Sequence, residues 1–169
     1  MYTMQSWTCF FQFICSMQSV CHCCDWIQHH YGHLSSEYLS LLDQMGGDIT
    51  EQDAPVFFPT SLYRHIDDAG VKTRILTFHT IYQITKLFDG NMKAVTWDKK
   101  NLDDFLNILE RQLENLKSCV SPAKKPERRL KRYSKELNRK NYSAQAWELI
   151  RKETRRHLQR LDIFKAKIH

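Results

Sequence analysis

Apolar residues recur at three- and four-residue intervals along most of the chain, which is the period of amphipathic helices. The first such stretch, residues 25–45, stops at Gly46-Gly47, and glycine is favoured directly after a helix C-terminus. The second stretch covers residues 61–88, where Gly70 favours a late helix start, since glycine costs about 1 kcal/mol relative to alanine inside a helix. Two helices are therefore predicted before residue 90.

The rest of the chain shows three more apolar stripes. A third helix is predicted from Thr96, the expected N-cap, to the break at Pro122. A short basic helix follows within residues 126–140, and the last helix spans residues 143–168. Gly and Pro number only 5 and 4, too few for the turns of a β-sandwich or barrel. We therefore expect an all-α four-helix bundle of up-up-down-down topology, with one additional short helix and long crossover loops.

Charge is distributed unevenly around the net value of +6. Residues 122–169 carry 16 Lys and Arg against 5 Asp and Glu, whereas the preceding 121 residues carry 9 against 14. So basic an end indicates an acidic partner, which could be nucleic acid, an anionic membrane or an acidic protein surface. Taken by itself, the basic run at residues 124–132 fits a nucleic-acid patch, a site for sulfated glycans or a solvated helix face.

The N-terminus indicates the compartment in which these charges act. Residues 7–17 form an apolar run of signal-peptide length that is too short to span a bilayer, and small residues follow up to Cys23. We expect residues 1–23 to be a removable signal peptide and residues 24–169 to form one secreted, extracellular domain. The competing interpretation is a buried N-terminal helix.

Removal of that segment would leave two of the six cysteines, Cys24 and Cys119. An even pair in an oxidising compartment predicts a disulfide, and closing so long a loop would add about 4–5 kcal/mol in the chain-entropy model. In the same compartment Asn141, within the triplet Asn-Tyr-Ser, is a candidate for glycosylation.

The residues give little support to a metal site or a catalytic centre. His29 and His33 lie four apart on the first predicted helix, a spacing that can hold a metal, but no second ligand pair has regular spacing. The sequence contains no Gly-rich phosphate loop, no nucleophile elbow and no paired-carboxylate motif. We predict no cofactor, no metal and no enzyme activity, and a protein that acts by binding.

The last predicted helix resembles the C-terminal signature of type I interferons. The residues that carry this resemblance are Ala146, Trp147, Glu148, Arg151, Glu153 and Arg156. The start of the third helix at Trp97-Asp98 and the Cys24-Asp25 pair are similar to the same family. The segment 30–35 and the presence of one disulfide rather than two are most similar to the virus-induced, interferon alpha-like (group a) proteins of salmonid-type bony fish.

This resemblance implies a helical cytokine in which Cys24 pairs with Cys119 and Trp147 is a core anchor. It places the receptor-binding residues on an exposed side of the last helix, at Arg151, Lys152, Arg155, Arg156 and Arg160. Arginine suits this role because its planar guanidinium makes forked contacts with carboxylates. The implied partners are cell-surface interferon (class II cytokine) receptor chains, with no nucleic acid and no membrane insertion after signal cleavage, and the protein is expected to be a monomer.

The function expected from the resemblance is that of a secreted antiviral cytokine that binds a two-chain receptor, activates JAK–STAT signalling and induces antiviral genes. Two alternatives stay open: an intracellular basic helical module that binds nucleic acid, and a related helical cytokine with a different receptor. Three departures from the family pattern bear on activity more than on fold. They are Gln145 where many mammalian members have a cysteine, the unusual stretch 69–79, and a basic helix that is a few residues short.

Overall fold

The computed structural model of the chain describes residues 34–47, 71–117, 120 and 131–166. The predicted signal peptide, Cys24 and Cys119, and His29 and His33 lie outside the described residues. No helix within the described part is long and apolar enough to cross a membrane.

Five helices and no strand are present in the described ranges, which confirms the predicted all-α class. They are a helix over residues 34–44, α3 (Val71–Phe88), α4 (Lys99–Lys117), α5 (Lys131–Arg139) and α6 (Ala144–Ala166).

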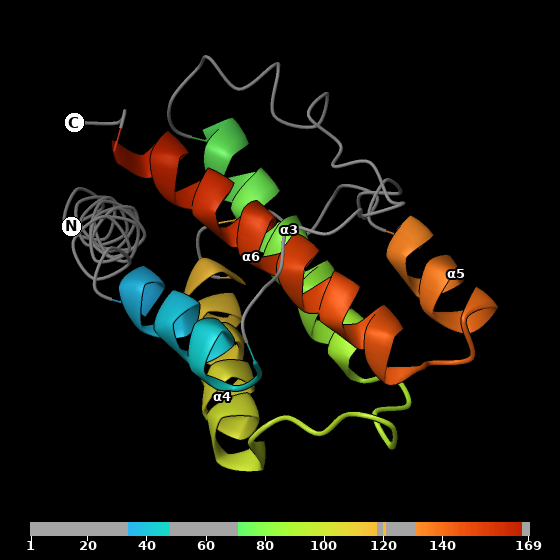
Figure 1. Ribbon diagram of the computed structural model, residues 1–169. Coiled ribbons are helices and arrows are strands. Elements are labelled where there is room, and N and C mark those ends of the chain that lie inside the picture. The colour runs from blue at the N-terminus through green and yellow to red at the C-terminus, as the bar shows by residue number, and fades with distance from the viewer. Residues whose placement is uncertain (1–33, 48–70, 118–119, 121–130, 167–169) are drawn as a thin grey trace, which may run out of the picture.

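The helices α3 and α6 pack antiparallel through the middle of the bundle (Figure 1). Helix α4 packs against α3, while α5 contacts both α3 and α6 from the other side. Figure 1 shows helix 34–44 and α3 running in one general direction, and α4 and α6 in the opposite one. This is the predicted up-up-down-down bundle, with α5 as the additional short helix.

Aromatic rings fill the core where α3, α4 and α6 meet. The Phe88 ring lies 5.6 Å from that of Phe105 and 5.7 Å from that of Trp147, and Trp97 meets Trp147 edge-on at 6.2 Å. Tilted and edge-on pairs of this kind add about 0.5–1.5 kcal/mol beyond the burial of their surface. The cluster thereby joins the first turns of α6 to the α3–α4 connection.

The start of α4 differs from the prediction, because Asp98 and not Thr96 is its N-cap. The Asp98 carboxylate accepts a hydrogen bond of 2.8 Å from the Asn101 backbone N–H, and the Asp98 carbonyl accepts one of 3.1 Å from Leu102. Aspartate caps more strongly than threonine, and its charge also suits the helix dipole. The Asp98 N–H in turn donates to the Met45 carbonyl at 2.7 Å, which joins the start of α4 to the end of helix 34–44.

Candidate functional site

A tight turn between α5 and α6 determines where the last helix begins. The Tyr142 N–H donates to the Leu137 carbonyl at 2.8 Å and the Asn141 N–H donates to Asn138 at 3.0 Å, the paired bonds of a Schellman motif. Asn141 and Tyr142 have φ values of 51° and 53°, and asparagine tolerates this left-handed conformation better than most residues. Ser143 then caps α6, since its Oγ accepts a hydrogen bond of 3.3 Å from the Ala146 N–H.

Trp147, the expected core anchor, is fully buried in the first turn of α6. Its indole Nε1 donates a 2.9 Å hydrogen bond to the Asn91 carbonyl, so the one polar atom of the ring is satisfied. Ring and hydrogen bond together hold α6 against the α3–α4 connection.

Arg151 lies inside the protein, so the expectation that it is exposed is wrong. Its exposed fraction is 0%, and its NH1 donates a 2.7 Å hydrogen bond to the Leu42 carbonyl while its NH2 donates to the Gly47 carbonyl. The physical reason is the helix period: Arg151 follows Trp147 by four residues and therefore lies on the same inward face. The arginine uses its fork to close the end of helix 34–44.

Glu148 completes the surroundings of the buried guanidinium. Its carboxylate accepts a 3.0 Å hydrogen bond from Arg151 Nε and a second bond from the Trp97 indole N–H. The Arg151 guanidinium also lies 5.8 Å from the centre of the Trp97 ring. A buried arginine is tolerated only when its charge is paired and its donors are satisfied, and this site meets both conditions.

Lys152, likewise expected to be exposed, is only 8% exposed. Residues 151–154 are all buried, because the neighbouring helices cover α6 on most of its circumference. Two of the five residues predicted to bind receptor are therefore not part of the surface.

A buried polar cluster joins α5 to α6 on the far side of α6 from helix 34–44. The Tyr133 hydroxyl and His157 Nε2 share a 3.0 Å hydrogen bond, and the two rings meet edge-on. A small cavity of about 10 Å³ lies beside them and is lined by Gln83 and Thr154 among others. Glu153 also lines it, and its Oε2 is buried with no hydrogen-bond partner in the described part of the chain.

Burial shifts the titration of this cluster. Burial, together with the nearby Arg132 charge, lowers the pKa of His157 to about 3, so the imidazole is neutral at physiological pH. Burial raises the pKa of the Tyr133 hydroxyl and of the Glu153 carboxyl, although Arg156 acts in the opposite direction on Glu153. The contact between α5 and α6 is therefore made by a neutral His157 imidazole and a neutral Tyr133 hydroxyl.

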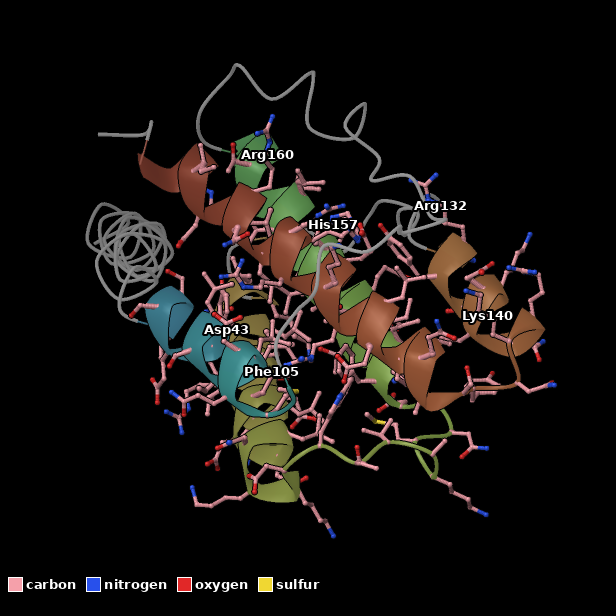
Figure 2. The ribbon with its side chains drawn as sticks, viewed as in Figure 1. Asp43, Phe105, Arg132, Lys140, His157 and Arg160 are labelled. Atoms are coloured by element: carbon pink, nitrogen blue, oxygen red, sulfur yellow. The ribbon has the colours of Figure 1, made fainter. Side chains whose placement is uncertain are left out.

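The other three predicted receptor residues reach the surface of α6. Arg155 makes a forked contact with the Asp43 carboxylate of helix 34–44, through Nε at 2.6 Å and NH2 at 3.2 Å. Figure 2 labels Asp43 on that helix. Arg156 is exposed and its NH1 donates to the buried Glu153 at 3.0 Å, while Arg160 lies exposed one turn further along. The exposed candidates therefore form a shorter stripe than predicted.

Comparison with known proteins assigns the family. The interferon family model, described as an interferon alpha/beta domain, matches residues 27–168. The chain belongs to the interferon alpha/beta family. It is 78% identical to interferon a3 of Oncorhynchus mykiss over 175 residues, which covers the whole of both chains. The predicted resemblance to salmonid alpha-like interferons is confirmed.

Solved structures support the same fold for this interferon. Zebrafish interferon 1 superposes with a TM-score of 0.74 at 35% identity, covering 84% of this chain and 98% of that one. Zebrafish interferon 2 superposes with a TM-score of 0.62 at 22% identity, covering 79% and 96%. At 22% identity, the similarity to zebrafish interferon 2 shows the fold alone.

Two features of the interferon site escaped the sequence analysis. His157 follows Ile150 by seven residues, so the apolar stripe of α6 could have indicated its burial. The ion pair between Arg155 and Asp43 joins residues far apart in the sequence, and no local pattern indicates it.

Proposed function

We propose that this interferon is a secreted antiviral cytokine that brings together two class II cytokine receptor chains and thereby activates JAK–STAT signalling. The observation that carries the proposal is the family match over residues 27–168, joined to 78% identity with a trout interferon. The proposal includes removal of residues 1–23, a Cys24–Cys119 disulfide and a monomeric cytokine.

The surface proposed for one receptor chain lies where helix 34–44 meets α6. We call it the α6 arginine stripe and define it as Arg155, Arg156 and Arg160. Asp43 holds the Arg155 guanidinium against helix 34–44, which lowers the entropy lost when a partner binds it. Arginine forks on such a surface match the carboxylates of an acidic receptor face.

A test of Arg156 as a receptor contact must also remove the charge of its ion-pair partner, because that partner, Glu153, is only 1% exposed. Replacing Arg156 alone would leave a buried carboxylate without its charge partner, and the protein would lose stability as well as any receptor contact. The pair Glu153→Gln with Arg156→Gln removes both charges together. Comparison with Glu153→Gln alone isolates what the exposed arginine contributes to binding.

The experiment that tests the proposal measures STAT phosphorylation in responsive fish cells treated with the secreted protein. We expect a response that soluble receptor ectodomains block. Removing Arg155, or Arg156 in the Glu153→Gln background, should weaken receptor binding by about 1–3 kcal/mol each, as charged interface contacts often do. Arg111→Ala is the matched control, because Arg111 is exposed on α4. A folded protein that gives no STAT response contradicts the proposal.

The secretory part of the proposal has its own measurement. Mass spectrometry of protein secreted by animal cells should show a chain that begins near Cys24, two mass units lighter than its fully reduced form. A secreted protein that retains Met1, or that carries free thiols at both cysteines, contradicts this part and leaves the receptor proposal to the signalling assay.

A further inference from the structure

The short helix α5 carries a concentration of positive charge that the α6 arginine stripe does not use. Its nine residues, Lys131–Arg139, contain four basic side chains and one acidic one, Glu136. The helix buries Tyr133 and Leu137 on one face, and the Tyr133 hydroxyl is bonded to His157 of α6. This anchorage determines which face of α5 points to solvent.

Three of the basic residues lie together on the solvent face of α5. Lys131, Lys135 and Arg139 are all exposed and follow one another at four-residue intervals. At 1.5 Å per residue their Cα atoms are about 6 Å apart along the helix, so the row extends over about 12 Å. We call these three residues the α5 basic stripe.

Little on the described surface neutralises the α5 basic stripe. Neither Lys131 nor Lys135 has an ion-pair partner in the part of the chain that the structure describes. Glu136 pairs with Arg139 at 2.6 Å and with Lys140 at 3.6 Å, and the hydrogen bond from Arg139 keeps the pKa of this carboxyl below its usual value. One carboxylate therefore faces several cations.

We infer that the α5 basic stripe binds a linear sulfated glycan of the cell surface or extracellular matrix. A row of cations at regular spacing matches a chain of sulfate groups by charge alone, and such basic patches also suit heparin. The inference rests on the proposed function, because it requires that the interferon acts outside the cell.

Two other polyanions fit the surface less well. An amphipathic helix that binds a membrane needs an outward apolar face, but the apolar residues of α5, Tyr133 and Leu137, are buried. Single-stranded nucleic acid is bound with aromatic rings on which bases stack. The exposed large hydrophobic residues of the described chain are Tyr82 and Ile163, and neither belongs to α5. A sulfated glycan needs no apolar or aromatic platform.

The stripe also lies apart from the α6 arginine stripe. Figure 1 shows α5 on the opposite side of α6 from helix 34–44, and Lys140 lies at the outer edge of the molecule in Figure 2. A glycan on α5 would therefore leave the surface around Arg155 and Asp43 accessible, so glycan binding could concentrate the cytokine at cells without blocking that surface.

Elution of the full secreted protein from immobilised heparin tests the inference. The test variant carries Lys131→Gln, Lys135→Gln and Arg139→Gln. The matched control carries Lys93→Gln, Lys99→Gln and Arg111→Gln, which removes the same charge from exposed residues elsewhere. We expect the test variant to elute at clearly lower salt and to bind heparin roughly tenfold more weakly at physiological salt. The slope of log affinity against log salt concentration should also fall by about one unit for each lost contact. The control should elute close to the unmodified protein.

Several results would overturn the inference. Equal shifts of the two variants would show that only net charge matters, and no shift of the test variant would exclude the stripe. Displacement from heparin by single-stranded DNA as effectively as by soluble heparin would favour a nucleic-acid surface.

Signalling by the same variants separates this inference from the proposed function. At saturating dose the test variant should retain the full STAT response, because the glycan is not the receptor. Loss of that response in a folded test variant would assign the stripe to a receptor and overturn the inference. If the unmodified protein gives no STAT response, the proposed function fails while the heparin comparison still decides whether α5 binds sulfated glycans.

Discussion

The guanidinium of Arg151 occupies the space that a side chain at Gly46 would need. A Cβ at Gly46 would lie 2.7 Å from Arg151 Cζ and 2.9 Å from each terminal nitrogen. Real Cβ contacts are essentially never so short, and the guanidinium cannot move aside because it is bonded to Leu42, Gly47 and Glu148. Glycine at 46 is therefore required by packing against α6, and not by a left-handed backbone.

Adjacent glycines offer a matched test of this relationship. Gly46→Ala should destabilise the interferon by about 1–3 kcal/mol, the usual cost of overpacking a filled site. Gly47→Ala should change stability by less than about 1 kcal/mol, because no atom of the residues that the structure describes lies within 4 Å of its added Cβ. Urea unfolding followed by circular dichroism measures both. Equal losses of stability from the two substitutions would show that the Arg151 guanidinium moves aside and does not constrain residue 46.

Arg151 itself should prove to be a structural residue. Arg151→Met would leave the Leu42 and Gly47 carbonyls without their donor and should cost about 3 kcal/mol or more of folding stability. Arg155→Met removes a charge from the same helix, but the Arg155–Asp43 pair is partly solvated and its loss should cost less than about 1 kcal/mol.

Receptor binding by these two variants completes the comparison. Measured on protein shown to be folded, Arg151→Met should bind receptor with nearly unchanged affinity, whereas Arg155→Met should bind more weakly. If Arg151→Met binds receptor more weakly than Arg155→Met, Arg151 contributes to receptor binding and its purely structural role is contradicted.

The sequence predicted the helices well because each apolar stripe encodes one packed face. The burial of Phe105, Leu109 and Leu116 on α4 follows from that period alone. The start of α4 was misplaced because Thr96 and Asp98 are both good caps, and the choice depends on the contact between Asp98 and Met45 across two helices. Local pattern cannot supply such a contact.

The predicted exposure of Arg151 and Lys152 was wrong for a related reason. Arginine and lysine were assigned to the surface because they are rarely buried, yet Arg151 is fully buried. Its carbonyl acceptors belong to the end of helix 34–44, far from it in sequence. The four-residue spacing from Trp147 indicated that Arg151 lies on the inward face. The prediction instead followed the general preference of charged residues for the surface.

The turn before α6 allows glycosylation at Asn141 to be separated from folding. Asn141 is exposed, and in protein secreted by animal cells we expect a glycan there that peptide N-glycosidase removes with a downward mobility shift. Asn141→Gly should abolish the shift without loss of stability, because glycine suits the left-handed φ of 51°.

Ser143 supplies the control for that prediction. Ser143→Ala should remove both the glycan and the N-cap of α6, with a loss of about 1 kcal/mol, whereas Ser143→Thr should retain both. A glycosidase shift that persists in Asn141→Gly would place the glycan elsewhere in the chain.

The buried cluster between α5 and α6 should make stability fall with acid through His157. The folded pKa of His157, about 3, is far below the ordinary value of 6.5, so between these values the unfolded chain binds a proton that the native protein does not. Unfolding therefore becomes easier as the pH falls from 6.5 towards 3, by up to about 5 kcal/mol if nothing compensates. Glu153 acts in the opposite direction, because its raised pKa lets the native protein take up a proton first as the pH drops towards 4.5.

Unfolding free energy measured against pH distinguishes the two groups. His157→Gln keeps a neutral partner for the Tyr133 hydroxyl and should flatten the loss of stability between pH 6.5 and 3, whatever its effect at neutral pH. Glu153→Gln should do the reverse and steepen the loss above pH 4.5, because it removes the compensating proton uptake. The slope is the decisive readout, since a merely structural role of either side chain would shift the whole curve and leave its slope unchanged. If His157→Gln has the slope of the unmodified protein, the acid sensitivity belongs to other groups and burial of the imidazole does not control it.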